Sequence, residues 1–237
     1  MRGAPGARPA ARRLEVDLGE RSYPIHLGVE TLSRVGPEVA RRTHAQLAVV
    51  ISVPGVARRY APALERSLRG AGLRTARLTV PDGDRSKRLA VVARLYGRLL
   101  ALGADRSSAL VALGGGMVGD LTGFTAATFL RGIPFVQVPT TLLAMVDASV
   151  GGKVGVNLPQ GKNLVGAFHQ PRLVWIDVAT LRTLPARERS AGFAEMVKAA
   201  ALWDGAFFAR LERDAEELCA LESPRLVPAL ARAVAIK

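Results

Sequence analysis

Apolar residues change their spacing several times along the chain, and each change marks an expected element. Residues Leu14–Leu18 and Tyr23–Leu27 alternate or run apolar on either side of a polar link, which predicts a β-hairpin. Four later segments favour strands, and the first of them is an unbroken apolar run: Gln46–Val53, Arg74–Val80, Ser108–Leu113 and Pro134–Val138. Helical spacing is found between these strands, at Thr31–Ala40, Val56–Ala71, Leu89–Leu99 and Met117–Phe129. Ser86 is expected to cap the third helix.

Alternation of strands and helices predicts an α/β domain with a mostly parallel sheet, which binds ligands at the carboxyl ends of its strands. From Arg187 to Lys237 the pattern is helical throughout, as in the opening of an all-helical domain. We therefore expect a disordered basic extension at residues 1–13, an α/β domain at 14–184 and the start of a helical domain at 185–237. No glycine, asparagine or proline ends the helical pattern before Lys237, so we expect the helical domain to be incomplete.

The net charge of +13 is compatible with nucleic-acid binding. However, the basic residues are scattered among acidic ones from Glu15 onward, and aromatic residues that could stack on bases make up only 5% of the chain. We therefore expect no nucleic-acid partner and a small anionic metabolite instead. A non-catalytic basic binding module is the alternative from a different class.

Composition also excludes several classes of protein. A single cysteine, Cys219, excludes a disulfide framework and a cysteine-built zinc site. No apolar run reaches the roughly 18 residues of a membrane span. The first 13 residues lack the apolar core of a secretory signal. We therefore expect a cytoplasmic protein without a membrane partner.

Lysine is rare in this chain, and its positions are therefore informative. Of 33 basic residues only five are lysine, at Lys87, Lys153, Lys162, Lys198 and Lys237. Lysine is a compact charge with an adjustable pKa, whereas arginine is a planar fork that stays charged. A chain that uses arginine almost everywhere is expected to keep lysine where arginine will not serve.

Two turns could hold an anion. Gly114-Gly115-Gly116-Met117-Val118-Gly119-Asp120 joins a predicted strand to a predicted helix, where glycines allow a pyrophosphate to approach the helix N-terminus. It is not the standard dinucleotide motif, and a plain tight turn is the alternative. Thr140 and Thr141 follow the next strand in the same way, although simple helix capping would also explain them.

Glycines and lysines are densest between Asp147 and Phe168. Lys153 and Lys162 lie nine residues apart there, in a segment that we interpret as a loop, and Asn163 follows directly. Two cations facing one anionic substrate would explain this pattern, and Arg131 could add a third.

Glu195 and Lys198 are three residues apart on one helical face with apolar neighbours. A surface ion pair is one explanation, and a metal bound by the carboxylate is another. His26, His44 and His169 form no paired motif, so we interpret them as structural or surface residues.

The run from Gly114 to Lys198 resembles the signature stretch of the 3-dehydroquinate synthase family, through GGGMVGDLTGFTAATFLRG, VPTTLLAMVDASVGGKVGVN, GKNLVGAFHQP and GFAEMVK. The resemblance implies a Rossmann-like N-terminal domain that binds NAD and a helical C-terminal domain that completes a zinc or cobalt site. It implies a phosphate-eliminating lyase of the shikimate pathway, which makes 3-dehydroquinate and phosphate from 3-deoxy-D-arabino-heptulosonate 7-phosphate. It also implies a homodimer when the chain is full length.

The resemblance assigns roles by position. Its cofactor contacts fall on Asp82, Gly83, Asp84, Lys87, Gly115, Gly116, Gly119, Asp120, Thr140, Thr141, Lys153, Lys162, Thr180, Leu181, Arg182 and Thr183. Its catalytic and substrate-binding residues fall on Arg131, Asp147, Lys153, Lys162, Asn163, Lys198 and Lys237. Its first metal ligand falls on Glu195.

Departures from the family pattern leave alternatives open. Asp84 replaces the usual glutamate, and Val53 replaces an aspartate or asparagine. Further metal ligands of the family lie beyond Lys237, so this chain alone is expected to be inactive. The alternatives are a cyclase of the 2-epi-5-epi-valiolone or amino-dehydroquinate type, or a metal-dependent polyol dehydrogenase of related fold.

Overall fold

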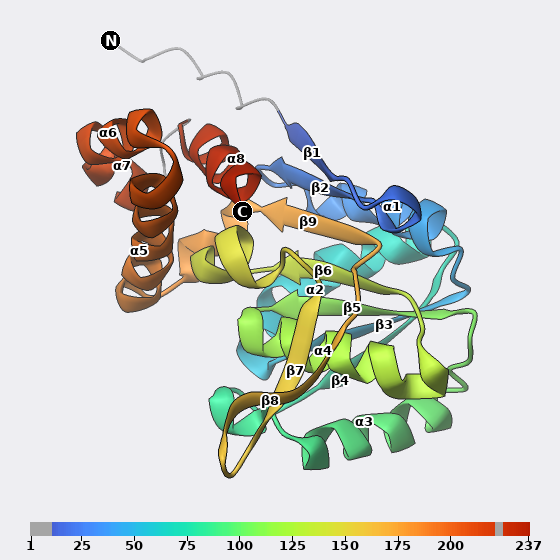
Figure 1. The fold of residues 1–237 in the computed structure, drawn as a ribbon. Helices are drawn as coiled ribbons and strands as arrows, with labels where there is room; N and C mark the ends of the chain where they lie inside the picture. The colour runs from blue at the N-terminus through green and yellow to red at the C-terminus, as the bar shows by residue number, and fades with distance from the viewer. Residues whose placement is uncertain (1–10, 221–224) are drawn as a thin grey trace.

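The computed structural model describes residues 11–220 and 225–237 and places most of the strands in one sheet (Figure 1). The order of this seven-stranded sheet is β1-β2-β9-β6-β5-β3-β4. Its strands are β1 (Arg12–Val16), β2 (Tyr23–Gly28), β3 (Leu47–Ser52), β4 (Arg74–Thr79), β5 (Ser108–Gly114), β6 (Phe135–Pro139) and β9 (Leu173–Asp177). All neighbours pair in parallel except β1 with β2. The predicted α/β fold with a mostly parallel sheet is confirmed.

Helices cover both faces of the sheet, which is why its central strands are continuously apolar. The covering helices are α1 (Val35–Thr43), α2 (Pro54–Gly70), α3 (Leu89–Ala101) and α4 (Gly116–Thr128). Every residue of β3 and of β5 is buried. One core lies between the sheet and α1 with α2, and a second lies on the side of α3 and α4. These cores fix the strand ends where the candidate site lies.

A separate hairpin packs against α4 and was not predicted. It consists of β7 (Lys153–Leu158) and β8 (Gly161–Phe168), so the lysine-bearing segment is a pair of strands rather than a loop. A Cβ at Gly123 of α4 would lie 2.3 Å from Val154 Cγ1, so only glycine lets the hairpin approach this closely. The expectation of a loop was wrong because glycines dilute the alternation of apolar and polar residues.

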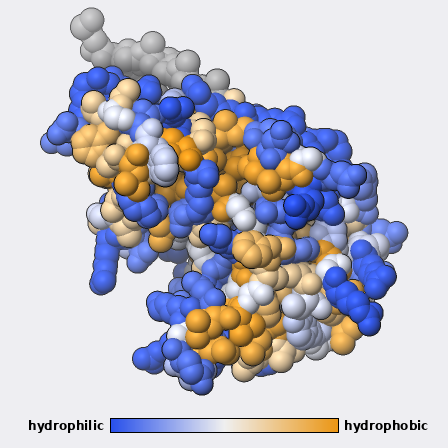
Figure 2. Space-filling model, in the orientation of Figure 1, coloured by the Kyte–Doolittle hydropathy of each residue, from blue (hydrophilic) through white to orange (hydrophobic). Residues whose placement is uncertain are grey.

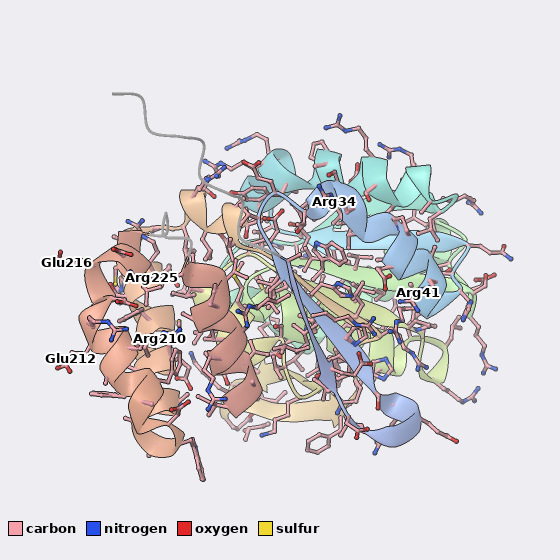
Figure 3. All side chains as sticks on the ribbon, turned by 90° about the horizontal axis from the view of Figure 1, so that it is seen from above. Arg34, Arg41, Arg210, Glu212, Glu216 and Arg225 are labelled. Atoms are coloured by element: carbon pink, nitrogen blue, oxygen red, sulfur yellow. The ribbon has the colours of Figure 1, made fainter. Side chains whose placement is uncertain are left out.

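The remaining described residues form helices, as predicted for the tail. These helices are α5 (Ala186–Trp203), α6 (Gly205–Arg213), α7 (Ala215–Ala220) and α8 (Leu226–Ile236). A third core joins them to β2 and β9. Seen from above, α6 with Arg210 and the start of α8 next to Arg225 lie beside the sheet, on the side away from Arg34 and Arg41 (Figure 3). Within the described residues, none of the helices combines the length and hydrophobicity that crossing a membrane requires.

Short helical turns connect these elements: η1 (Gly19–Arg21), η2 (Leu32–Arg34), η3 (Asp84–Ser86), η4 (Phe129–Arg131), the π-helical turn η5 (Ala144–Ala148) and η6 (Val178–Thr183). Ser86 lies inside η3, and α3 begins after Arg88 without a side-chain cap, so the expected cap at Ser86 was wrong. Strand β1 begins at Arg12, two residues before the expected hairpin, and residues 1–10 lie outside the described residues. The division at residues 184 and 185 stays a prediction.

Candidate functional site

The glycine turn leaves the first amides of α4 without a side-chain partner. Strand β5 ends at Gly114, α4 begins at Gly116, and Gly115 at the N-cap offers no side-chain acceptor. A Cβ at Gly115 would lie 3.0 Å from Thr141 Cγ2, so the turn is narrow and unfilled. The Thr140 N–H donates to the Gly114 carbonyl over 2.9 Å, which holds the two predicted turns side by side. This arrangement fits a pyrophosphate, because the amides and the helix dipole both favour an anion.

Lys87 ties three of the predicted motifs together. Its side chain is nearly buried, and its ammonium contacts the Asp120 carboxylate after the glycine turn and the Asn163 amide oxygen on β8. The Asn157 N–H donates to the Lys87 carbonyl over 2.7 Å, and the Asn163 N–H donates to Asn157 Oδ1 over 3.0 Å. Burial raises the pKa of the Asp120 carboxyl, and the contact with Lys87 opposes that rise. The hairpin is therefore anchored to the end of the sheet through one cation.

A cavity of about 400 Å³ opens beside this anchor. Its polar lining consists of Asp120, Asp147, Lys153, Asn163 and Lys237, and its apolar lining includes Val150, Val154 and Phe168. Asp147 lies on η5 and pairs with Lys237 at the end of α8. Burial lowers the pKa of the Lys237 ammonium. The cavity therefore brings together two carboxylates, two ammonium groups and a carboxamide from four parts of the chain.

Lys162 belongs to a second cavity. Asn163, which lines the first cavity, has a left-handed backbone with a φ of 57°, and the neighbouring Lys162 lines the second cavity instead. Its ammonium lies 2.8 Å from the Asp84 carboxylate, and this hydrogen bond is the main reason why the pKa of Asp84 falls below its ordinary value. The second cavity measures about 490 Å³ and lies between the residues around η3 and the turn of the β7–β8 hairpin. Lys153 and Lys162, which were predicted to face one substrate, are therefore separated.

Three other predicted residues lie away from the main cavity. Arg131 lies on η4, which follows the C-terminal end of α4, whereas the glycine turn lies at the N-terminal end. A helix of this length separates its two ends by about 20 Å. Asp82 accepts a hydrogen bond from the Gly83 N–H over 2.8 Å on an exposed loop. Lys198 pairs with Glu195 on α5, and its side chain is 61% exposed. The structure brings none of these three side chains to the cavity.

The later segment that the resemblance assigns to cofactor binding is held in place by residues that the sequence did not single out. Thr180 and Leu181 of η6 are buried, and Arg182 pairs with Glu30 over 2.9 Å. The Tyr60 hydroxyl of α2 donates to the Thr180 carbonyl over 2.9 Å and lies 2.7 Å from Thr183 Oγ1. Turn η6 follows β9, two strands from the glycine turn. It can therefore contribute to a ligand that spans the strand ends.

Asp177 was missed by sequence reasoning although it ends a short apolar run. Its buried carboxylate accepts backbone hydrogen bonds from Glu30, Thr31, Leu32 and Ala179 at 2.6 to 3.0 Å. It thereby joins the loop after β2 to η6. An acidic residue directly after an apolar run of strand length was the signal that could have revealed it.

Glu195 is the predicted metal ligand, and its position depends on how α5 packs. Gly192, one turn earlier, lies so close to η5 that an added Cβ would be 2.5 Å from the Leu143 nitrogen. Across residues 11–220 and 225–237, no three His, Cys, Asp or Glu side chains gather into a group that could hold a metal ion. His26 stacks on Trp175, His169 stacks on Phe135, and His44 follows the last residue of α1; their interpretation as structural or surface residues stays a prediction.

Comparisons with known proteins show similarity in sequence and in fold. Residues 77–191 match the family model described as 3-dehydroquinate synthase N-terminal. The 3-dehydroquinate synthase of Desulforamulus reducens is 47% identical over 90% of this chain and 59% of its own length. A 2-deoxy-scyllo-inosose synthase complexed with carbaglucose-6-phosphate, NAD⁺ and Co²⁺ superposes with a TM-score of 0.82 at 28% identity, over 95% of this chain and 61% of that one.

A second similar structure is the 2-epi-5-epi-valiolone synthase of Streptomyces hygroscopicus subsp. jinggangensis 5008 with NAD⁺ and Zn²⁺ bound. Its TM-score is 0.82 at 29% identity, over 93% of this chain and 61% of that one. The chain thus spans about three fifths of the length of the relatives it matches. The matching segment, the curated relatives and the fold all indicate similarity to the N-terminal part of 3-dehydroquinate synthases.

Proposed function

We propose that the chain forms the NAD- and substrate-binding region of a 3-dehydroquinate synthase. The whole enzyme would convert 3-deoxy-D-arabino-heptulosonate 7-phosphate to 3-dehydroquinate and phosphate. One observation carries the proposal: the unfilled glycine turn and a cavity of mixed charge are joined through Lys87. A dinucleotide on the turn and an anionic sugar in the cavity would then lie next to each other.

The charge of each group in this chain would determine which part of the cofactor or substrate it binds. Backbone amides at the start of α4 would hold the pyrophosphate. Lys153 and Lys237 would hold the carboxylate or phosphate of the sugar, because both line the cavity. Lys237 pairs with Asp147 in the structure, and an anionic substrate would draw the Lys237 ammonium away from it. The Asp147 carboxylate would then be free to accept a proton. NAD, when bound, supplies the reversible removal of a hydride.

The described residues do not fit a complete metal centre. A catalytic zinc needs about three protein ligands, and among the described residues only Glu195 is a candidate. The similar cyclases carry Co²⁺ or Zn²⁺, so we include a divalent metal in the proposal for the whole enzyme. We assign it no step here.

Another cyclase of the same fold is the nearest alternative, and the similar valiolone and inosose synthases favour it. The substrate distinguishes the two, since only the shikimate enzyme would release phosphate from the heptulosonate phosphate. A metal-dependent polyol dehydrogenase would instead accumulate NADH with glycerol. Lys153 in the cavity argues against it, because a neutral polyol needs no cation.

Calorimetric titration with NAD tests the proposal on the 237-residue chain. We expect saturable binding, and we expect Gly115→Val to abolish it by filling the turn. Gly97→Val on α3, where an added Cβ meets nothing within 4 Å, is the matched control. A folded circular-dichroism spectrum without any heat from NAD would overturn the proposal. In a chain extended to the length of its relatives, Lys153→Ala should abolish phosphate release.

A further inference from the structure

The strand next to the glycine turn ends without an acidic residue. In open parallel sheets of this kind, NAD is usually selected by an aspartate or glutamate that hydrogen-bonds the ribose 2′-hydroxyl, whereas a nearby arginine accommodates the 2′-phosphate of NADP. Strand β3 lies beside β5 and ends at Ser52, after which Val53 leads into α2. Val53 is 5% exposed and apolar. This position therefore offers no carboxylate to bind a 2′-hydroxyl or to repel a 2′-phosphate.

The loop after the next strand carries two acids, Asp82 and Asp84, and only Asp84 lines the second cavity, where it is already engaged. Strand β4 lies beside β3, and the loop after it carries Asp84. The Asp84 carboxylate lies 2.8 Å from the Lys162 ammonium, so its charge is largely neutralised. A 2′-phosphate near this pair would meet a cation and a compensated anion rather than a free carboxylate.

Two unpaired arginines lie on the same loop. Arg85 and Arg88 are exposed and line the second cavity together with Lys87 and Lys162. Within the described part of the chain, the side chains of Arg85 and Arg88 make no hydrogen bond or ion pair. Two guanidinium groups without side-chain partners thus border a space of about 490 Å³, whose lining also includes the Asp84–Lys162 pair. Guanidinium groups bind phosphate through paired, charge-assisted hydrogen bonds.

We propose that this chain accepts NADP as well as NAD, with Arg85 and Arg88 binding the 2′-phosphate. The inference rests on the proposed function, because it concerns the same dinucleotide site. With Val53 at this position, no carboxylate discriminates against the 2′-phosphate of NADP, and the two arginines would attract that phosphate. The chemistry of the reaction would not change, since the 2′-phosphate lies far from the nicotinamide ring in the cofactor itself.

Parallel titrations with NAD and NADP on the 237-residue chain test this inference. We expect dissociation constants that agree within about threefold, and an Arg85→Ala/Arg88→Ala variant in which NADP binding weakens at least about tenfold while NAD binding changes less than about twofold. Arg94→Ala, which removes an exposed arginine farther along α3, is the control and should alter neither. Val53→Asp should weaken NADP selectively.

The outcomes separate the inference from the function. If the chain binds NAD but prefers it over NADP by more than about a hundredfold, the inference is wrong and the proposed function stands. If the double arginine variant lost affinity for NAD and NADP equally, the inference would also be wrong. That result would show that the arginines attract any anionic dinucleotide and do not bind the 2′-phosphate. If neither dinucleotide binds to the folded chain, the proposed function itself fails. Because Arg85 and Arg88 are exposed, their variants remain informative even if Val53→Asp does not fold.

Discussion

The sheet and the helical tail differ in how completely they bury their apolar side chains. Strands β3 and β5 have no exposed residue, whereas Leu202 and Trp203 at the end of α5 are 65% and 78% exposed. Figure 2 shows apolar residues gathering on one face over α5–α8, and again over the β7–β8 hairpin and α3. The glycine turn is thus fixed by two complete cores, whereas Glu195 is positioned by the packing of a few helices. We therefore expect substitutions to disturb the part of the candidate site around the glycine turn less than the part around Glu195.

The largest effect is expected at Lys87, which lines the second cavity and contacts two residues that line the first. Lys87→Met would leave the Asp120 carboxylate largely buried without its cation, since the side chain of Asp120 is only 20% exposed. Removing one partner of a buried pair costs about 3–5 kcal/mol. Urea unfolding of both proteins measures the difference.

Lys162→Met is the control for this prediction, because the Lys162 side chain is 76% exposed and forms only a surface pair with Asp84. It should change the free energy of unfolding by less than about 1 kcal/mol. Equal effects of the two substitutions would show that Lys87 does not anchor the hairpin.

A smaller loss of stability is expected from a glycine substitution in the helical tail, and the same substitution in a helix that covers the sheet should not cause it. Gly192→Ala would push α5 away from η5, because the new Cβ would lie 2.5 Å from the Leu142 Cβ and from the Leu143 nitrogen. Overpacking of this kind costs about 1–3 kcal/mol. Thermal unfolding followed by circular dichroism is the measurement.

Gly97→Ala on α3 is the matched helical control. The added methyl group meets nothing within 4 Å there, so the change should stabilise the protein by about 0.5–1 kcal/mol. If Gly192→Ala also stabilises the chain, then α5 does not pack on η5 as described.

Two carboxyls of the sheet half should respond to pH with opposite signs. The pKa of Asp120 is raised by burial, so its folded form binds a proton more tightly than its unfolded form. Stability should therefore fall as pH rises from the ordinary value of 3.8 through the raised pKa. The pKa of Asp84 is lowered, chiefly by its hydrogen bond with Lys162, so its contribution is present above 3.8 and is lost as pH falls toward the lowered pKa.

Urea unfolding across this pH range, with Asp120→Asn and Asp84→Asn, measures the two contributions. Asp120→Asn should flatten the decline above pH 3.8, and Asp84→Asn should flatten the loss below it. Carboxyl titration by nuclear magnetic resonance gives the two pKa values directly. A pKa of Asp120 below its ordinary value would mean that Lys87 outweighs burial, which is the opposite of our expectation.

The fold could be predicted from the sequence wherever burial is uniform. Strand β5 was predicted within one residue, because both of its faces are covered and every position is apolar or small. The β7–β8 hairpin could not be, because positions of β8 such as Lys162, Asn163 and Leu164 are all exposed. Its register depends on contacts with α4 and Lys87, which lie far away in the sequence.

The candidate site could be predicted as a set of residues but not as a geometry. Resemblance indicated Asp147 and Lys237, which are 90 positions apart and pair in the structure. It could not show that Lys162 turns to Asp84 while Asn163 turns to Lys87, because that depends on the local backbone, which is left-handed at Asn163. Tyr60 and Asp177 act through backbone groups, and such contacts leave little trace in a sequence.

The smallest effect is expected at Glu195, where the comparison between the two halves is sharpest. Glu195 pairs with the exposed Lys198, and surface pairs of this kind contribute about 0–1 kcal/mol. A catalytic zinc takes about three protein ligands, and the described residues gather no such group. The 237-residue chain should therefore bind NAD but lose zinc on dialysis, and Glu195→Gln should change neither property. Elemental analysis beside the NAD titration measures both.

Stoichiometric zinc that disappears in Glu195→Gln would show that the tail already holds a metal site. In a chain extended to the length of its relatives, Glu195→Gln should instead remove both zinc and activity while NAD binding persists, because the glycine turn belongs to the sheet.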